Sequence, residues 1–132
     1  MLKQISPLEE LNKECEEIQD FLDITVGDEP QEIIDRGNDL AVYISRTSKM
    51  LADAKAHQDA KKKSAIMENL RDVGLKARVP ASTLNDLIKA SCEDENYLVA
   101  WIDRLNRTAT HQLDWCRTLI SKYKEELKYS QV

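Results

Sequence analysis

The sequence has very few of the residues that a β-rich protein needs in order to turn its chain. Three glycines and three prolines are spread over 132 residues, whereas a sandwich or barrel needs a turn signal about every 8–12 residues. Folds rich in hairpins are therefore excluded. Hydrophobic residues make up 42% of the chain, which is enough for a core and argues against disorder. We expect a single helical domain over residues 1–132.

Long apolar runs are also missing. No run approaches the roughly 18 residues of a membrane span, and residues 1–7 lack the apolar centre of a signal peptide. We therefore expect a cytoplasmic protein that does not bind a membrane.

Metal-ligating residues are scarce and scattered. Only two histidines, His57 and His111, could join the cysteines in a metal site, and no Cys-x-x-Cys pair offers the tight spacing that structural zinc requires. We expect no cofactor and interpret the cysteines as buried, reduced thiols: Cys15, Cys92 and Cys116.

Two short amphipathic helices are predicted, at about 7–22 and 80–91. Ser6 and Glu9 have the spacing of a capping box at the start of the first, and Ser91 has the same place before the helix that follows the second. Apolar residues of the first helix recur every three or four positions: Leu8, Leu11, Cys15, Ile18 and Leu22.

Two long helices are predicted, at about 30–75 and 93–128, with apolar positions alternating every four and three residues as in a coiled-coil seam. The first seam comprises Ile33, Gly37, Leu40, Ile44, Thr47, Leu51 and Ala54. The second comprises Leu98, Ile102, Leu105, Ala109, Gln112, Cys116, Leu119 and Tyr123. We expect the two seams to pack antiparallel. Because the first seam is long and one chain has few helices to cover it, we also expect a homodimer.

Two features interrupt the first seam. Residues 55–64 turn polar, which is typical of helix positions beyond the end of a partner or facing solvent. Neither glycine nor proline occurs there, so a continuous helix to about residue 75 is favoured, and a break near Lys62 is the alternative. Gly37 costs about 1 kcal/mol relative to alanine inside a helix, and we expect a close helix approach to be the reason for it.

The second long helix is apolar on both flanks of its seam. Trp101 and Trp115 lie on one flank, and Leu113, Ile120 and Leu127 lie on the other. Such a helix should touch at least two neighbours. The sequence therefore predicts an all-α, elongated helical bundle with two long antiparallel helices and two short ones, rather than a bare hairpin.

The net charge of −5 is unevenly distributed: residues 1–45 carry −9, residues 46–78 carry +5, and the remainder carries −1. Such asymmetry can orient a partner. A rigid acidic helix can also imitate the phosphates of DNA, although an ordinary solvated helix face has the same composition. The candidate acidic partner face comprises Glu9, Glu10, Glu16, Glu17 and Asp20.

The basic third of the chain is the candidate for nucleic-acid binding, since phosphate contacts need lysine and arginine. It contains no aromatic side chain and no recognised reading motif, so a solvated tip or a patch for an acidic protein is favoured. The candidate basic patch comprises Lys55, Lys61, Lys62, Lys63, Arg71, Lys76 and Arg78.

Four further side chains are candidates for function. Trp101 and Trp115 are candidate hot spots for binding, although their regular place beside the seam favours anchoring in the core. His111 lies one helical turn from Asp114, a pair that could begin a general-base or metal site. Neither a nucleophile nor a third ligand is near, so we interpret it as a surface pair and expect no catalytic residue, no metal and no enzyme activity.

Segments of both long helices carry a resemblance to known proteins. They are Arg36-Gly37-Asn38-Asp39-Leu40-Ala41, Met50-Leu51-Ala52-Asp53-Ala54-Lys55, residues 97–107 and residues 110–121. The chain resembles small helical proteins encoded by phages and integrated elements of gut bacteria, over most of residues 30–128. Small proteins in that setting often bind and inhibit host defence or nucleic-acid-processing machinery. The resemblance implies a helical protein-binding inhibitor or regulator with an unidentified protein partner, and nucleic-acid binding through residues 46–78 is the alternative.

Overall fold

The computed structural model describes residues 4–76 and 80–130, without the side chains of residues 72–76. Within these ranges the chain forms four helices and no strand: α1 (Leu8–Leu22), α2 (Pro30–Lys76), α3 (Ala81–Ser91) and α4 (Glu93–Ser130). The predicted all-α class is confirmed, and each predicted helix boundary lies within two residues of the observed one. No helix among the described residues combines the length and apolar character needed to cross a lipid bilayer.

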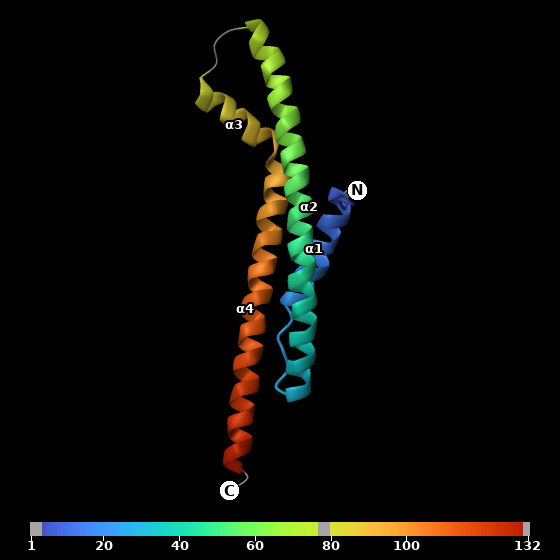
Figure 1. The fold of residues 1–132 in the computed structure, drawn as a ribbon, viewed down its shortest axis with the longest axis vertical. Helices are drawn as coiled ribbons and strands as arrows, with labels where there is room; N and C mark the ends of the chain where they lie inside the picture. The colour runs from blue at the N-terminus through green and yellow to red at the C-terminus, as the bar shows by residue number, and fades with distance from the viewer. Residues whose placement is uncertain (1–3, 77–79, 131–132) are drawn as a thin grey trace.

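The two long helices pack side by side and antiparallel, as Figure 1 shows. Hydrogen bonds fix their register: Gln58 Nε2 donates to Asn96 Oδ1 at 2.7 Å, and Arg36 Nη2 donates to Gln112 Oε1 at 2.8 Å. Most of the predicted seam positions are buried at this contact: Ile33, Leu40, Thr47 and Ala54 on α2, with Leu98, Ile102, Leu105, Ala109 and Cys116 on α4. The seam was therefore predicted correctly from its spacing.

One polar contact lies inside the seam. Thr47 is fully buried, and its hydroxyl donates to Tyr43 O in the preceding turn at 2.8 Å. Asn106 Nδ2 of α4 donates in turn to Thr47 Oγ1 at 2.9 Å. Because a buried hydroxyl is costly without partners, this contact favours one register of α2 on α4 over its neighbours.

The polar stretch at residues 55–64 lies where α4 begins. α2 runs through it as one helix of 47 residues, about 70 Å long at 1.5 Å per residue, so the alternative of a break near Lys62 is wrong. The Gln58–Asn96 bond is close to the first residue of α4, Glu93. Beyond it α2 continues without α4, and α3 folds back beside it (Figure 1). The seam stops because its partner stops.

α1 covers one face of the α2–α4 pair. Its buried residues are those of its predicted apolar stripe: Leu11, Cys15, Ile18 and Leu22. The predicted capping box does not form, because Pro7 occupies the cap position without a side-chain hydrogen bond. Instead the backbone of Ser6 is held by α2, through Asp53 and His57. Ser91 does not cap α4 either, since its hydroxyl donates to Leu87 O at 2.9 Å in its own helix.

Gly37 does not mark a tight approach of the two long helices. A Cβ atom built at this position would meet only Leu113 Cδ1, at 3.6 Å, which is ordinary van der Waals contact. The packing of α2 on α4 therefore leaves room for a methyl group, and the expected steric reason for this glycine is wrong.

Candidate interaction surfaces

The acidic residues of α1 share one outward side of the helix, and one exposed base, Lys13, lies among them. Glu9, Glu10, Glu16, Glu17 and Asp20 are all exposed, and at about 100° per residue they span roughly 120° of the helix. The buried residues Leu11, Cys15, Ile18 and Leu22 occupy the opposite side. The candidate acidic partner face is thus a single surface, and nothing in the described part of the chain covers it.

Contacts on both edges hold α1 in place. On one edge the guanidinium of Arg46 forms a two-pronged pair with the carboxylate of Glu14, with Nη2 to Oε2 at 2.8 Å. On the other edge Trp101 Nε1 donates to Gln19 Oε1 at 3.1 Å. Bidentate pairs fix orientation as well as distance. The acidic face is therefore presented at a defined angle to the long helices.

The candidate basic patch does not form a single face. Lys61, Lys62 and Lys63 are consecutive on a continuous helix, so their side chains leave α2 about 100° apart and point in three directions. Lys55 and Arg71 are exposed on the same helix. Arg78 and the side chain of Lys76 lie outside the described residues. A phosphate backbone following one side of α2 would meet only part of this set.

The two tryptophans differ in their surroundings. Trp101 is half-buried against the core and hydrogen-bonded to α1, as the core interpretation predicted. Trp115 is 57% exposed, so the core interpretation is wrong for it. The difference follows from the length of α1, which ends at Leu22 and leaves only the connecting segment beside Trp115.

The residues considered for catalysis or metal binding do not come together into a site in the described part of the chain. His111 is exposed, and Asp114 pairs with Arg117 Nη1 at 3.3 Å rather than with His111. All three cysteines are buried and unpaired with one another. Among the described residues no group of three or more histidine, cysteine or acidic side chains is arranged to hold a metal ion.

The face of the α2–α4 pair opposite α1 is an open groove. α4 contacts both α2 and α1, as expected of a helix that is apolar on both flanks. Within the described part of the chain, its second flank lies beside α2 alone. The groove contains an open hollow of about 550 Å³. Its apolar or small lining residues are Ile33, Ile34, Gly37, Ala41, Leu113 and Ile120. Arg117 and Lys124 line it on the α4 side.

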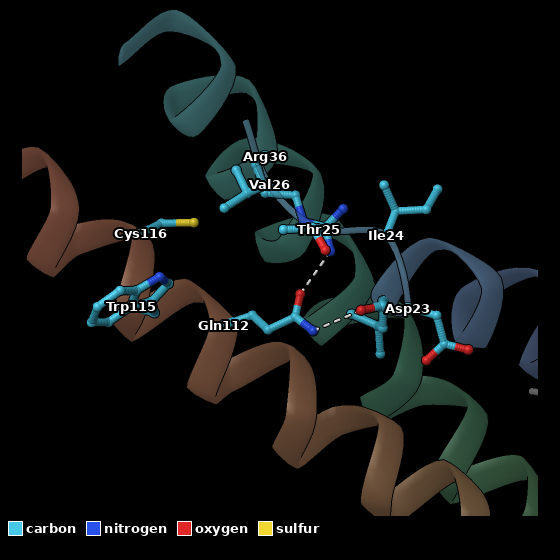
Figure 2. A pocket seen from close by; sticks show the side chains of 9 residues that line it. Asp23, Ile24, Thr25, Val26, Arg36, Gln112, Trp115 and Cys116 are labelled. Carbon is cyan, nitrogen blue, oxygen red and sulfur yellow. Dashed lines mark hydrogen bonds between the residues drawn. The ribbon is translucent and has the colours of Figure 1, made fainter. Parts of the chain in front are cut away.

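A second pocket was not anticipated from the sequence. It lies where the segment joining α1 to α2 passes over α4, and has a volume of about 280 Å³. Figure 2 shows Gln112 reaching from α4 toward this segment, between Arg36 and Trp115. Gln112 Nε2 donates to Leu22 O at 2.9 Å, while its Oε1 accepts from Arg36. We call this the Arg36 pocket; it is lined by Leu22, Asp23, Ile24, Thr25, Val26, Arg36, Gln112, Trp115 and Cys116.

No protein family, curated protein or solved structure matches the chain.

Proposed function

We propose that this protein is a non-catalytic helical module that binds another protein through the acidic face of α1. The arrangement of charged side chains on α1 supports this proposal. Five exposed carboxylates share one side of α1, and the opposite side is anchored on the long helices. Preset charges of this kind steer a basic partner into register and speed its encounter.

The kind of partner follows from the charge and from the resemblance to phage-encoded proteins. A basic target surface, such as the nucleic-acid-binding groove of a host enzyme, complements five carboxylates on a rigid helix. The protein would then act as an inhibitor or regulator of host defence or of nucleic-acid-processing machinery, by occupying that surface in the cytoplasm. No covalent step is required of it.

The test begins with affinity purification from the native host and mass spectrometry to identify a partner. The variant Glu9→Lys, Glu10→Lys, Glu16→Lys, Glu17→Lys is then compared with the wild type in association kinetics over a range of salt concentrations. Association should slow and lose most of its salt dependence, because the steering charges are reversed.

The matched control reverses four exposed acids elsewhere: Glu68→Lys, Glu93→Lys, Asp94→Lys and Glu125→Lys. It changes the net charge equally and also alters the first turn of a helix, here α4, so it corrects for helix-dipole effects. An association rate that is the same in both variants would show that the acidic face does not mediate docking. Recovery of no partner, together with turnover of a substrate by the purified chain, would refute the non-enzymatic proposal.

Nucleic-acid binding through residues 46–78 is the second candidate. It is supported by exposed lysines on the part of α2 that extends past α4, including Lys61 and Lys63. A gel shift that weakens with salt and is lost in Lys61→Ala, Lys62→Ala, Lys63→Ala would establish it. Absence of a shift at about 50 mM salt would remove it, since phosphate contacts are strongest at low salt.

A further inference from the structure

Arg36 is a buried cation without an acidic partner. Only 9% of it is exposed, yet the ion pairs in the described part of the chain belong to Arg46, Lys49, Arg107 and Arg117. Burying a charge is costly unless an opposite charge or several hydrogen bonds compensate. Arg36 therefore needs an explanation that the fold alone does not supply.

In the described part of the chain, the groups that contact the guanidinium are neutral. The guanidinium carbon lies 4.0 Å from the centre of the Phe21 ring, a cation–π contact. Nη2 donates to Gln112 Oε1. The amide of Gln112 is fixed in this orientation, because its Nε2 donates to Leu22 O on the other side. These contacts orient the guanidinium and leave its positive charge unneutralised.

The pocket opens in front of this charge. The described residues include no enclosed polar side-chain atom that lacks a hydrogen-bond partner. The guanidinium N–H groups that do not bond to Gln112 are therefore not sealed off, and Arg36 lines the open pocket. Paired N–H groups on a planar guanidinium match the two oxygens of a carboxylate. One cation suits the single charge of a carboxylate better than a multiply charged phosphate.

The walls indicate what the carboxylate would be attached to. The volume of about 280 Å³ is at or below the low end of small-molecule pockets, so it admits a carboxylate and a few further atoms. Trp115 forms one wall, and a neighbouring hollow of about 390 Å³ shares Trp115, Thr25 and Val26. An apolar body joined to the carboxylate could follow the indole from one hollow into the next.

The acidic group at the rim belongs to Asp23, which lines the pocket and is exposed. Its Oδ1 accepts from Gln19 Nε2 at 3.0 Å, and Figure 2 shows its carboxylate turned away from Arg36. Asp28, Lys122 and Glu126 lie around the neighbouring hollow. Asp23 should weaken the binding of a carboxylate ligand by charge repulsion. It does not itself occupy the place of that ligand at Arg36.

We propose that the Arg36 pocket binds a carboxylate carried on an apolar group, with the guanidinium of Arg36 holding the carboxylate and Trp115 packing on the apolar group. The source is either the carboxylate of a partner protein or a free small acid. This site lies apart from the acidic face of α1. If the pocket binds no carboxylate, the proposed function is unaffected, and if the acidic face binds no partner, the proposal for the pocket is unaffected.

The experiment follows the Arg36 Nε–H and Trp115 indole N–H signals by nuclear magnetic resonance in the full chain. The probes are propionate, 3-phenylpropionate and the neutral propionamide. Both carboxylates should shift both signals to saturation, and propionamide should not. The aromatic acid should bind about fivefold more tightly, because its ring stacks on Trp115.

Variants separate the roles of the two residues. Arg36→Met keeps the volume of the side chain, removes the charge and should abolish the response at Trp115. Trp115→Ala changes an exposed residue and should remove the preference for 3-phenylpropionate while propionate still binds. Asp23→Asn should increase the binding affinity for both acids severalfold, because it removes the repelling charge. Arg117→Met, at an exposed arginine, is the matched control and should leave all responses unchanged.

Two peptides distinguish the sources: a short peptide ending in leucine with a free carboxylate, and the same peptide amidated. Binding of the free-acid peptide at least tenfold tighter than propionate would assign the site to a partner protein, and equal binding would assign it to a small acid. The proposal is overturned if propionamide shifts the signals as propionate does, if inorganic phosphate binds more tightly than propionate, or if binding survives in a folded Arg36→Met.

Discussion

The backbone N–H of Ser6 donates to the carboxylate of Asp53, 47 positions along the chain, at 3.2 Å. Lys49 Nζ pairs with the other carboxylate oxygen and also donates to Gln4 O at 3.2 Å. The carboxylate of Asp53 thus fastens the segment before α1 to α2. Burial alone would raise the pKa of Asp53, but the hydrogen bonds from Lys49 and from the Ser6 backbone outweigh it and lower that pKa.

Asp53→Asn should therefore destabilise the protein in a pH-dependent way. Because the folded-state pKa lies below the unfolded value of about 3.9, the stabilisation is present above that value and is lost as the pH falls through the folded-state pKa. We expect a loss of about 1–3 kcal/mol at neutral pH that shrinks below about pH 4. Urea unfolding of the variant and the wild type, at neutral pH and below about pH 4, measures this difference in the free energy of unfolding. Asp59→Asn, at an exposed position of α2, should change little at either pH.

Gly37→Ala should stabilise the protein. The new methyl group meets only Leu113 Cδ1 at an ordinary distance, and alanine gains about 0.5–1 kcal/mol over glycine in a helix. The midpoint of thermal unfolding should rise by a few degrees. Ala52→Gly, at an exposed position of α2 outside the groove, should lower it by a comparable amount. A lower midpoint for Gly37→Ala would show that the helices approach more closely than 3.6 Å suggests.

The three cysteines should be unreactive until the protein unfolds. Burial, together with the neighbouring Glu14 and Glu16, raises the pKa of Cys15 to about 12, and burial also raises the pKa of Cys116. Since the thiolate is the reactive form, an aromatic disulfide reagent at about pH 8 should label none of them in the native protein and all three in denaturant. Rapid labelling of native Cys15 would contradict the buried position of this residue.

The same shift predicts a loss of stability at high pH. A folded-state pKa above the unfolded one gives stability that is complete below the unfolded value, here 9.0, and declines as the pH rises toward the folded value of about 12. Cys15→Ala should flatten this decline, because it removes the thiol that titrates. Unfolding measured between these two pH values tests the sign, and a decline of equal slope in the variant would assign it to other groups.

Self-association is expected through the open groove between α2 and α4. The seam that suggested a dimer is covered by α4 of the same chain, but Ile34, Ala41 and Ile120 still line an open surface, with Arg117 and Lys124 on its α4 side. A twofold dimer would bury the same groove on both copies. Light scattering at high micromolar concentration should give twice the mass of 15.2 kDa, and Ala41→Glu should restore the monomer. A single-chain mass for the wild type would contradict the dimer.

The sequence was most informative where structure depends on local spacing. Leu40 and Leu105 could be placed in the core because the four-three repeat puts them on one side of their helices, whatever those helices pack against. The polar stretch at 55–64 was likewise expected to lie beyond the end of a partner or to face solvent, and α4 begins beside it. Boundaries followed from Pro30 and Pro80, since proline suits the start of a helix.

Positions that depend on a third segment could not be predicted. Trp101 and Trp115 have equivalent places in the repeat of α4, and they differ only because α1 ends before reaching Trp115. Arg36 resembles any exposed arginine in sequence, yet Phe21 and Gln112 come from 15 and 76 residues away to enclose it. The capping box at Ser6 failed for a similar reason, because the distant Asp53 accepts the hydrogen bond of the Ser6 backbone N–H. Ser91 differs, since its hydroxyl bonds to Leu87 O within its own helix.

The antiparallel pairing of α2 and α4 also orders the contacts by the length of chain that separates them. Gln58 and Asn96 are 38 positions apart, whereas Arg36 and Gln112 are 76 apart and Leu22 and Gln112 are 90 apart. Each doubling of the length of a closed loop adds only about 0.6 kcal/mol of entropic cost. Once the contacts that are nearer in sequence have formed, a shorter segment remains to be closed by each of the others. We therefore expect the contacts between α2 and α4 to form first near α3 and then successively toward Pro30, and α1 to pack on the pair last. Core substitutions such as Leu98→Ala should then slow folding, while Ile18→Ala should chiefly speed unfolding.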